Sequence, residues 1–360
     1  MFKKRSLDQG PVITTAAWFI IAGCSVAFLM FFRTFLQPFV VALILWFVIG
    51  EFRYLLEKIK IKGKSLPLPI LTILSSLVIF YFFYISIDIV IINIQKLTNN
   101  IGLYSDNLVS MLEQLEEAFG IQDLSESVEG QEEKIISAMT SLAGGLASFV
   151  GRFFLVILYV IFLLLEEFGL SKKMQGIVSA KSSNVSENIR TILSLFRAYM
   201  SIKMFSSFMT GFLSYFVLLF LGIDLPALWA FIIFLLNFIP SVGSIVATAF
   251  PVLFSAIQYG DFSKSLYVLL GVLSVQVLIG NVVEPRLLGN RLNLSPIVIL
   301  LGLTFWGYVW GVVGMLLSVP IMAMMMIIFS QFESTRNIAI FFSHDGNIAD
   351  MMVGKVPKKT

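Results

Sequence analysis

The chain has 360 residues, of which 58% are hydrophobic and 13% are charged, and its mean hydropathy is +0.92. Soluble domains carry about 25% charged residues, so this composition excludes an ordinary soluble domain and indicates a polytopic membrane protein. The net charge is +3, and the sequence shows no basic patch that indicates nucleic-acid binding, so we expect no nucleic-acid partner. With one cysteine and one histidine, we also expect no disulfide framework, no metal site and no cofactor other than Na⁺ or H⁺ as a coupling ion.

Apolar segments long enough to span a bilayer occur along most of the chain. They cover residues 12–32, 35–50, 68–92, 149–165, 204–221 and 266–283. Two longer apolar runs, 227–257 and 297–329, have enough residues to enter the membrane and return. The sequence therefore predicts an all-α polytopic membrane protein with about eight transmembrane segments, including two broken helical hairpins.

Polar and small residues interrupt both long runs. The first contains Asn237, Pro240, Ser241, Gly243 and Ser244, and the second contains Trp306, Gly307, Gly311 and Gly314. Backbone that leaves the helical hydrogen-bond ladder inside a bilayer must be satisfied by protein or by a water-filled cavity, so such breaks are typical of transport sites. We expect the first hairpin to turn at residues 240–243.

The distribution of Lys and Arg predicts the orientation, because basic loops remain in the cytoplasm. Basic residues gather at 3–5, 53–64 and 172–197, whereas the interval between Lys96 and Lys134 has none and is rich in Asp and Glu. We therefore expect both termini in the cytoplasm and the acidic interval outside. It should form two amphipathic helices that pack on the bundle or on a neighbouring subunit.

This pattern divides the chain into five parts. They are three N-terminal transmembrane helices (1–95), an acidic extracytoplasmic helical segment (96–148), a fourth transmembrane helix with a basic amphipathic cytoplasmic segment (149–203), a transport core with two hairpins (204–332) and a cytoplasmic tail (333–360). The core contains a helix and a hairpin twice, in opposite orientations. This favours an inverted repeat, although any polytopic protein offers such pairings by chance.

Glu284 is the strongest candidate for chemistry inside the membrane. It follows an apolar helix in the sequence Asn281-Val-Val-Glu284-Pro285-Arg286, and Gln276 lies eight residues earlier on nearly the same helical face. A charged side chain at the bilayer centre costs about 2.5 kcal/mol or more, so such residues are usually paired or functional. Two interpretations stay open. One is a structural ion pair, either with Arg286, which requires Pro285 to break the helix, or with Arg291, and the other is a direct role in coupling.

The first hairpin tip supplies the other candidate ligands. Asn237, Ser241 and Ser244 could bind a polyhydroxylated solute or an alkali cation, or they could simply cap their own turn. Pro240, Gly243, Pro285, Gly307 and Gly311 are expected hinge or tip residues, and the spacing of Gly307 and Gly311 is also typical of helix packing. Our hypothesis is that the hairpins meet near the midplane. Asn237, Ser241, Ser244, Gln276 and Asn281 then contact the solute or ion, and Glu284 couples protons or sodium.

Enzyme motifs such as HExxH, Gly-x-Ser-x-Gly or a Walker loop do not occur, so we expect a non-enzyme powered by ion gradients. Several stretches in the last third of the chain resemble those of a known family of membrane proteins. They are 237–244 (NFIPSVGS), 280–289 (GNVVEPRLLG), 294–296 (LSP), 305–307 (FWG) and 310–320 (WGVVGMLLSVP). Over about 100 residues the chain resembles the autoinducer-2 exporter (AI-2E) family of bacterial permeases. Many relatives carry an aromatic residue and a proline where Ser241 and Ser244 stand here.

The resemblance implies a bacterial inner-membrane exporter or permease. We expect a homo-oligomer whose partners are the lipid bilayer and a small polar solute or monovalent cation. Some relatives are described as Na⁺(Li⁺)/H⁺ antiporters, and others are associated with release of autoinducer-2. Three functions therefore remain: gradient-driven export of a small polar solute such as autoinducer-2, Na⁺(Li⁺)/H⁺ antiport, and a scaffold or channel without active transport.

Overall fold

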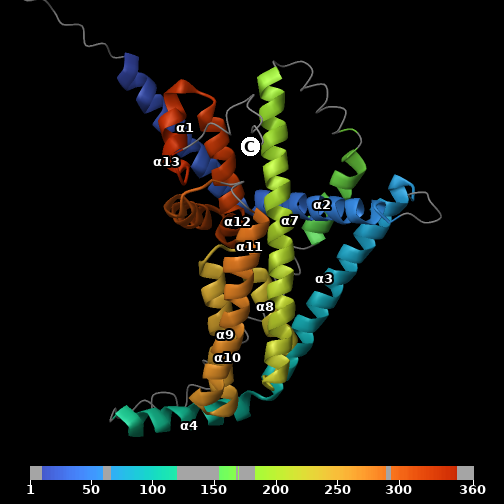
Figure 1. Ribbon diagram of the computed structural model, residues 1–360, viewed down its shortest axis with the longest axis vertical. Coiled ribbons are helices and arrows are strands. Elements are labelled where there is room, and N and C mark those ends of the chain that lie inside the picture. The colour runs from blue at the N-terminus through green and yellow to red at the C-terminus, as the bar shows by residue number, and fades with distance from the viewer. Residues whose placement is uncertain are drawn as a thin grey trace, which may run out of the picture.

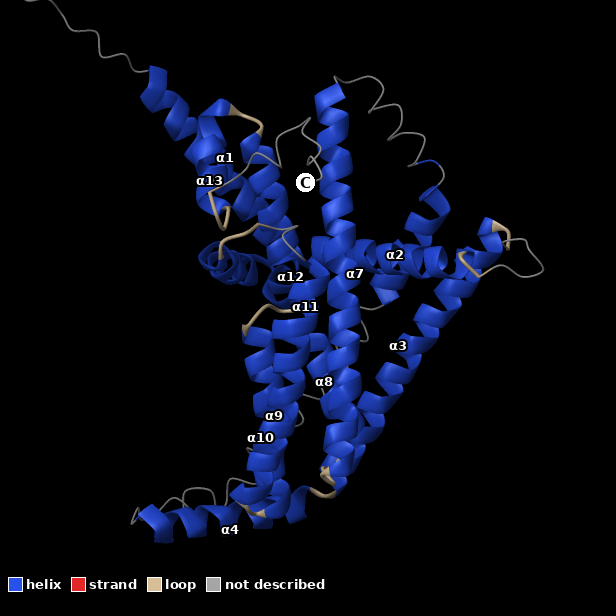
Figure 2. Ribbon diagram, in the orientation of Figure 1, coloured by secondary structure: helices blue, strands red, loops and turns tan. Residues whose placement is uncertain are grey.

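The computed structural model describes residues 10–59, 66–119, 154–167, 169, 183–288 and 293–346. These residues form helices joined by short turns, and none of them forms a β-strand (Figure 2). Within the described ranges, the β pairing consists of an isolated antiparallel bridge between Leu294 and Ser343. The all-α fold predicted from the sequence is thus confirmed.

The helices follow one another along the chain as shown in Figure 1. They are α1 (Gly10–Phe31), α2 (Arg33–Glu57), α3 (Leu68–Asn99), α4 (Ile101–Phe119), α7 (Ser183–Phe220), α8 (Pro226–Leu236), α9 (Val242–Tyr259), α10 (Phe262–Val277), the π-helical turn η1 (Leu278–Val283), α11 (Glu284–Leu288), α12 (Pro296–Ser330), the 3-10 turn η2 (Glu333–Thr335) and α13 (Arg336–Phe342). Residues 154–167 are also helical.

Six helical segments of the described chain are long and apolar enough to cross a membrane. They are Arg33–Glu57, Leu68–Asn99, Ile192–Phe220, Val242–Tyr259, Phe262–Leu287 and Pro296–Ser330. Shorter apolar helices at Ala16–Phe31 and Pro226–Leu236 accompany them. The chain is therefore a polytopic membrane protein.

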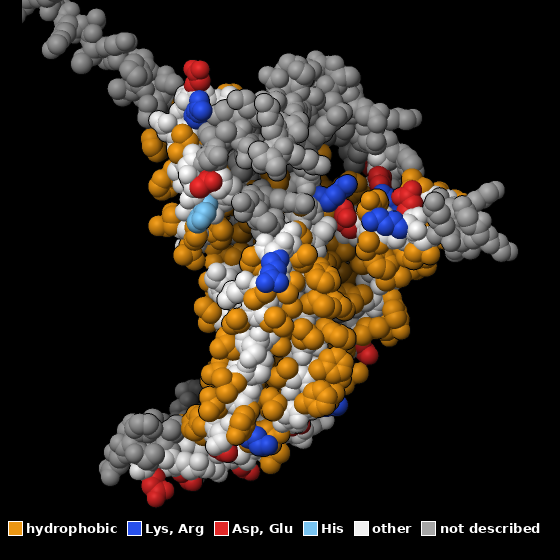
Figure 3. All heavy atoms as spheres, viewed as in Figure 1, with side chains coloured by type: hydrophobic (Ala, Val, Ile, Leu, Met, Phe, Trp, Pro, Cys, Tyr) orange, Lys and Arg blue, Asp and Glu red, His pale blue; other side chains and the backbone are white. Residues whose placement is uncertain are grey.

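The centre of the molecule is a bundle in which α7 and the continuous α10–η1–α11 segment run in opposite directions (Figure 1). Helices α8 and α9 pack with them, and α4 lies across one end of the bundle. Hydrophobic side chains cover most of the visible bundle face, whereas acidic side chains gather at the α4 end (Figure 3). This distribution suits a bundle surrounded by lipid with one polar end in water.

The first hairpin turns where the sequence predicts it. Helix α8 begins with Pro226 in its first turn, α9 begins at Val242, and Ser241 between them has a left-handed φ of 56°. A Cβ atom on Gly243 would lie 1.9 Å from the carbonyl oxygen of Leu236. Only glycine allows the two arms to approach so closely, which confirms the broken hairpin.

The second hairpin lies within α12. Gly311 has φ 61° and ψ −141°, outside the helical region, and divides α12 into two arms. A Cβ on Gly302 would come within 2.6 Å of Met322 Cγ, and a Cβ on Gly314 within 1.8 Å of the Trp306 carbonyl oxygen. A straight helix would separate residues 302 and 322 by about 30 Å, so the arms must fold back on each other. The second predicted hairpin is confirmed, with Gly311 at its tip.

Helix α7 differs from the expected division of the chain at residue 203. It continues without interruption from Ser183 to Phe220, so the basic amphipathic segment and the transmembrane helix are one element. No proline lies in this interval to break the helix. Its first half packs against α2, where Phe196 contacts Phe47 with ring centroids 5.5 Å apart and Arg197 Nε lies 2.9 Å from Glu51 Oε1.

Candidate functional site

A stripe of polar side chains runs along the buried face of α7. Lys203, Ser206, Ser207, Thr210 and Ser214 are each at most 7% exposed and recur every three or four residues. The other face of the helix carries exposed phenylalanines: Phe205, Phe208, Phe212 and Phe216. Polar groups inside a membrane protein are costly, and those that face the bundle interior usually mark a functional path.

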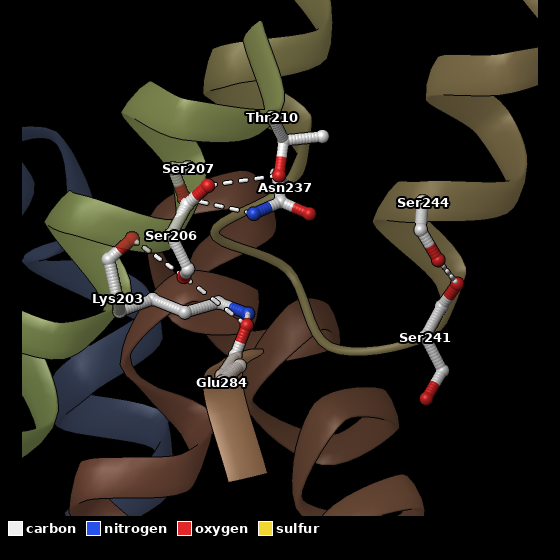
Figure 4. A network of polar contacts seen from close by, with 8 residues as sticks. All are labelled: Lys203, Ser206, Ser207, Thr210, Asn237, Ser241, Ser244 and Glu284. Carbon is white, nitrogen blue, oxygen red and sulfur yellow. Dashed lines mark hydrogen bonds and ion pairs between the residues drawn. The ribbon is translucent and has the colours of Figure 1, made fainter. Parts of the chain in front are cut away.

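An ion pair joins this stripe to Glu284. Lys203 Nζ lies 2.9 Å from Glu284 Oε1 and 3.1 Å from Oε2, and the Ser206 hydroxyl donates to Oε2 at 3.1 Å (Figure 4). The side chains of Lys203 and Glu284 are only 8% and 19% exposed. Two opposite charges are stable at such depth only when paired and hydrogen-bonded, and both conditions hold here.

The π-helical turn η1 sets the position of Glu284. In an α-helix Pro285 could not donate to the carbonyl of Asn281, and its ring would clash with that carbonyl. The wider turn over Leu278–Val283 removes this conflict and lets the helix continue into α11. Because the turn adds one residue, it rotates the face carrying Glu284 by about 100° relative to α10. Turns of this kind are frequent at functional sites.

Asn237 belongs to the same cluster. Its Nδ2 donates to Ser207 Oγ at 3.1 Å, and both side chains are buried. Ser207 follows Ser206, which holds Glu284, so adjacent hydroxyls of α7 connect the first hairpin to the ion pair (Figure 4). The structure therefore brings together Asn237 and Glu284, two of the candidates that the sequence singled out.

Ser241 and Ser244 lie apart from this cluster (Figure 4). The Ser244 hydroxyl donates to the Ser241 carbonyl at 2.8 Å, which is the self-capping alternative considered from the sequence. The Ser244 carbonyl accepts from Thr248 Oγ1 at 2.9 Å and from Gln276 Nε2 at 3.4 Å. Ser244 and Gln276 thus line a different feature, an apolar groove of about 440 Å³ between α9 and α10.

Among the described residues, the partner of Glu284 is Lys203 and not Arg286, one of the two arginines considered from the sequence. No ion pair among the described residues joins Glu284 to Arg286, which is exposed. Side chains two residues apart on a helix point to different faces, and Pro285 does not break the helix as that pairing required. Arg291 lies outside the described residues, and the side chain of Asn281, in η1, is exposed. Lys203 was not selected from the sequence, although the Ser and Thr residues that follow it every three or four residues indicate a polar face of the helix.

The tip of the second hairpin is held by hydrogen bonds to α1 and α2. Trp310 Nε1 donates to the Leu29 carbonyl of α1 at 3.1 Å, and Gln37 Nε2 of α2 donates to the Trp310 carbonyl at 2.6 Å. A Cβ on Gly307 would lie 2.9 Å from Met315 Cε, so this glycine serves the close packing of the two arms. The described contacts of this tip therefore lead to α1 and α2.

Two broken hairpins, with a charged pair buried between membrane helices, define a membrane transport protein. The chain belongs to the AI-2E family: the model described as "AI-2E family transporter" matches residues 16–334.

Curated relatives agree with this membership. The chain is similar to the "AI-2 transport protein TqsA" of Escherichia coli K12, with 31% identity over 255 residues, which is 69% of this chain and 74% of that protein. It is 35% identical over 204 residues to a "Putative transport protein" of Haemophilus influenzae, covering 56% of this chain and 58% of the relative. A protein of the same name from Borreliella burgdorferi is 35% identical over 208 residues, covering 56% and 57%. The match thus spans little more than half the length of the latter two.

Proposed function

We propose that this protein is a secondary transporter of the bacterial inner membrane that exports a small polar solute, such as autoinducer-2, using an ion gradient. The observation that carries the proposal is the buried Lys203–Glu284 pair, held between α7 and the π turn and continued by the hydroxyls of α7. The name of the Escherichia coli relative supports the choice of solute.

The ion pair suggests how ion and solute are coupled. Among the described residues, Lys203 is the cation that neutralises Glu284, and a proton or Na⁺ that reaches the carboxylate takes its place. A hydroxyl of the solute donates to the same carboxylate only when no proton or Na⁺ occupies it, so ion and solute bind alternately. Mutually exclusive binding couples exit of the solute to entry of the ion, as an exporter driven by an inward gradient requires.

Na⁺(Li⁺)/H⁺ antiport is the second candidate. The carboxylate oxygens of Glu284 and the hydroxyls of Ser206 and Thr210 are hard oxygen donors, the ligand type that small alkali and alkaline-earth cations prefer. In this case the cation and the proton exchange at Glu284 and no organic solute takes part.

We further propose that both termini lie in the cytoplasm and that the protein works as a homo-oligomer. The orientation rests on the basic residues at 3–5, 53–64 and 172–197 and on the acidic character of the segment that includes α4.

The test is transport by the purified protein in liposomes. One set of vesicles is loaded with autoinducer-2 and given a pH gradient, and another reports proton movement after Na⁺ or Li⁺ is added. Gradient-dependent efflux of the solute that Glu284→Gln abolishes, and that the exposed control Glu333→Gln retains, supports the exporter. Cation-driven proton flux without solute efflux identifies the antiporter instead. If correctly folded protein gives neither solute efflux nor cation-driven proton flux, the protein is a scaffold or a channel without active transport.

A further inference from the structure

The loop between α7 and α8 is held rigidly at the α4 end of the bundle. The Gly222 carbonyl accepts from Tyr259 Oη at 2.8 Å and from Gln258 Nε2 at 3.1 Å, and the Asp224 N–H donates to Gln258 Oε1 at 2.8 Å. Leu225 is held at φ 59° and ψ 40°, a left-handed conformation that is rare for a branched side chain. Strain of this kind persists where the surroundings enforce it and clusters at binding sites.

A cavity of about 350 Å³ lies beside this loop, between it and the junction of α3 with α4. Its polar lining is Lys96, Asn100, Tyr104 and Asp224, and its apolar lining includes Leu219 and Pro226. The volume falls within the range of about 300–1,000 Å³ found for small-molecule sites. Leu219, which lines the cavity, lies about 24 Å along α7 from Lys203, so the cavity is separate from the Lys203–Glu284 pair.

Opposite charges line this cavity without neutralising each other. Tyr104, which is 3% exposed, donates from its hydroxyl to Asp224 Oδ2 at 3.0 Å and so fixes the carboxylate. No ion pair among the described residues includes Lys96 or Asp224. One carboxylate oxygen of the exposed Asp224 and the ammonium group of the exposed Lys96 thus have no charged partner in the described part of the chain and are open to a ligand.

We propose that this cavity binds a small zwitterion of the amino-acid type with an apolar side chain. The ligand ammonium pairs with Asp224, the ligand carboxylate pairs with Lys96 and the Asn100 amide, and the side chain packs against Leu219 and Pro226. A neutral polyol leaves both protein charges without a counter-charge, and a simple cation or anion leaves one. The inference goes beyond the transport proposal and does not rest on it, because binding is measured without any gradient.

The experiment is equilibrium binding of radiolabelled leucine to the purified protein in detergent. Leucinamide, which lacks the carboxylate, and ribose, a neutral polyol, are the competitors. Trp229 of α8, whose Nε1 donates to the Asp224 carbonyl at 3.1 Å, contributes a fluorescence signal that responds to the loop. Asp224→Asn keeps an acceptor for Tyr104, and Lys96→Gln removes an exposed charge, so both variants should fold. Asp106→Asn and Lys264→Gln, exposed residues outside the cavity, are their controls.

We expect leucine to bind and unlabelled leucine to compete at least about tenfold better than leucinamide or ribose. Each cavity variant should weaken binding about tenfold or more, the effect of losing one charge-assisted hydrogen bond, while the controls bind as wild type. The proposal is overturned if leucine does not bind, if ribose or leucinamide competes equally, or if Lys96→Gln and folded Asp224→Asn both retain full affinity. Loss of transport with intact binding contradicts only the function proposed above.

Discussion

Removing the buried lysine tests whether Lys203 and Glu284 stabilise each other in the folded protein. In Lys203→Met the carboxylate of Glu284 loses both contacts to Nζ, at 2.9 and 3.1 Å, and the Ser206 hydroxyl, at 3.1 Å, is its remaining partner among the described residues. In Glu284→Gln the ammonium group of Lys203, 8% exposed at the side chain, keeps a carbonyl acceptor but no counter-charge. In both cases one charge is left buried without its partner.

The expected loss in the free energy of unfolding follows from how deeply the Lys203 and Glu284 side chains are buried. Breaking a buried pair by removing one partner costs about 3–5 kcal/mol. Because the Glu284 side chain is 19% exposed and retains Ser206, we place Lys203→Met at the lower end, about 3 kcal/mol. The double variant Lys203→Met/Glu284→Gln buries no charge, so it should be more stable than the sum of the single effects predicts by at least about 1.5 kcal/mol.

The assay is reversible unfolding in mixed micelles with increasing dodecyl sulfate, followed by circular dichroism. Lys264→Met, a substitution at an exposed lysine, is the matched control and should change the free energy of unfolding by less than about 0.5 kcal/mol. If the two single effects add within about 0.5 kcal/mol in the double variant, the groups do not interact and the reasoning fails.

Three further predictions concern other parts of the chain. Gly314→Ala places a Cβ 1.8 Å from the Trp306 carbonyl oxygen and should destabilise the second hairpin by about 3 kcal/mol or more, whereas Gly23→Ala, with no atom within 4 Å, should be neutral or stabilising in the same unfolding assay. Burial, and then the hydrogen bond and charge of Asp224, raise the pKa of Tyr104 to about 12. The folded state therefore holds this proton more tightly than the unfolded chain, whose tyrosine pKa is about 10, and stability present below pH 10 is lost as the pH rises towards 12. The tyrosinate absorbance of wild type minus Tyr104→Phe should show this late transition, and a transition near pH 10 would contradict it. Pro285→Ala restores an N–H that lets η1 close to an α-turn, so gradient-driven flux should fall without loss of helix content, and unchanged flux would refute the role of the π turn.

The sequence predicted the elements whose cause is local. Apolar length indicated the membrane helices, and Gly243 and Gly311 fall at or beside the two tips because close backbone approach and left-handed φ angles both require glycine. The amphipathic pattern of α4 was also sufficient to predict that helix.

The candidate site depended on tertiary contacts that no local pattern contains. The partner of Glu284 lies 81 residues away on α7, and one added residue in η1 decides which face of the helix the carboxylate occupies. Gln276 and Glu284 are eight residues apart and would lie on nearly the same face of an unbroken α-helix. The residue added in η1 removes this alignment. Ser241 and Ser244 were grouped with Asn237 by proximity in the chain, although the turn directs Asn237 towards α7 and leaves Ser241 exposed.

The most direct measurement of the central claim is solute flux in proteoliposomes as the imposed pH gradient is varied through zero and reversed. We predict that wild-type flux changes direction with the gradient, while Glu284→Gln carries only downhill flux that does not depend on the gradient. Gradient-dependent flux that persists in folded Glu284→Gln at the wild-type rate would contradict the assignment of coupling to the Lys203–Glu284 pair.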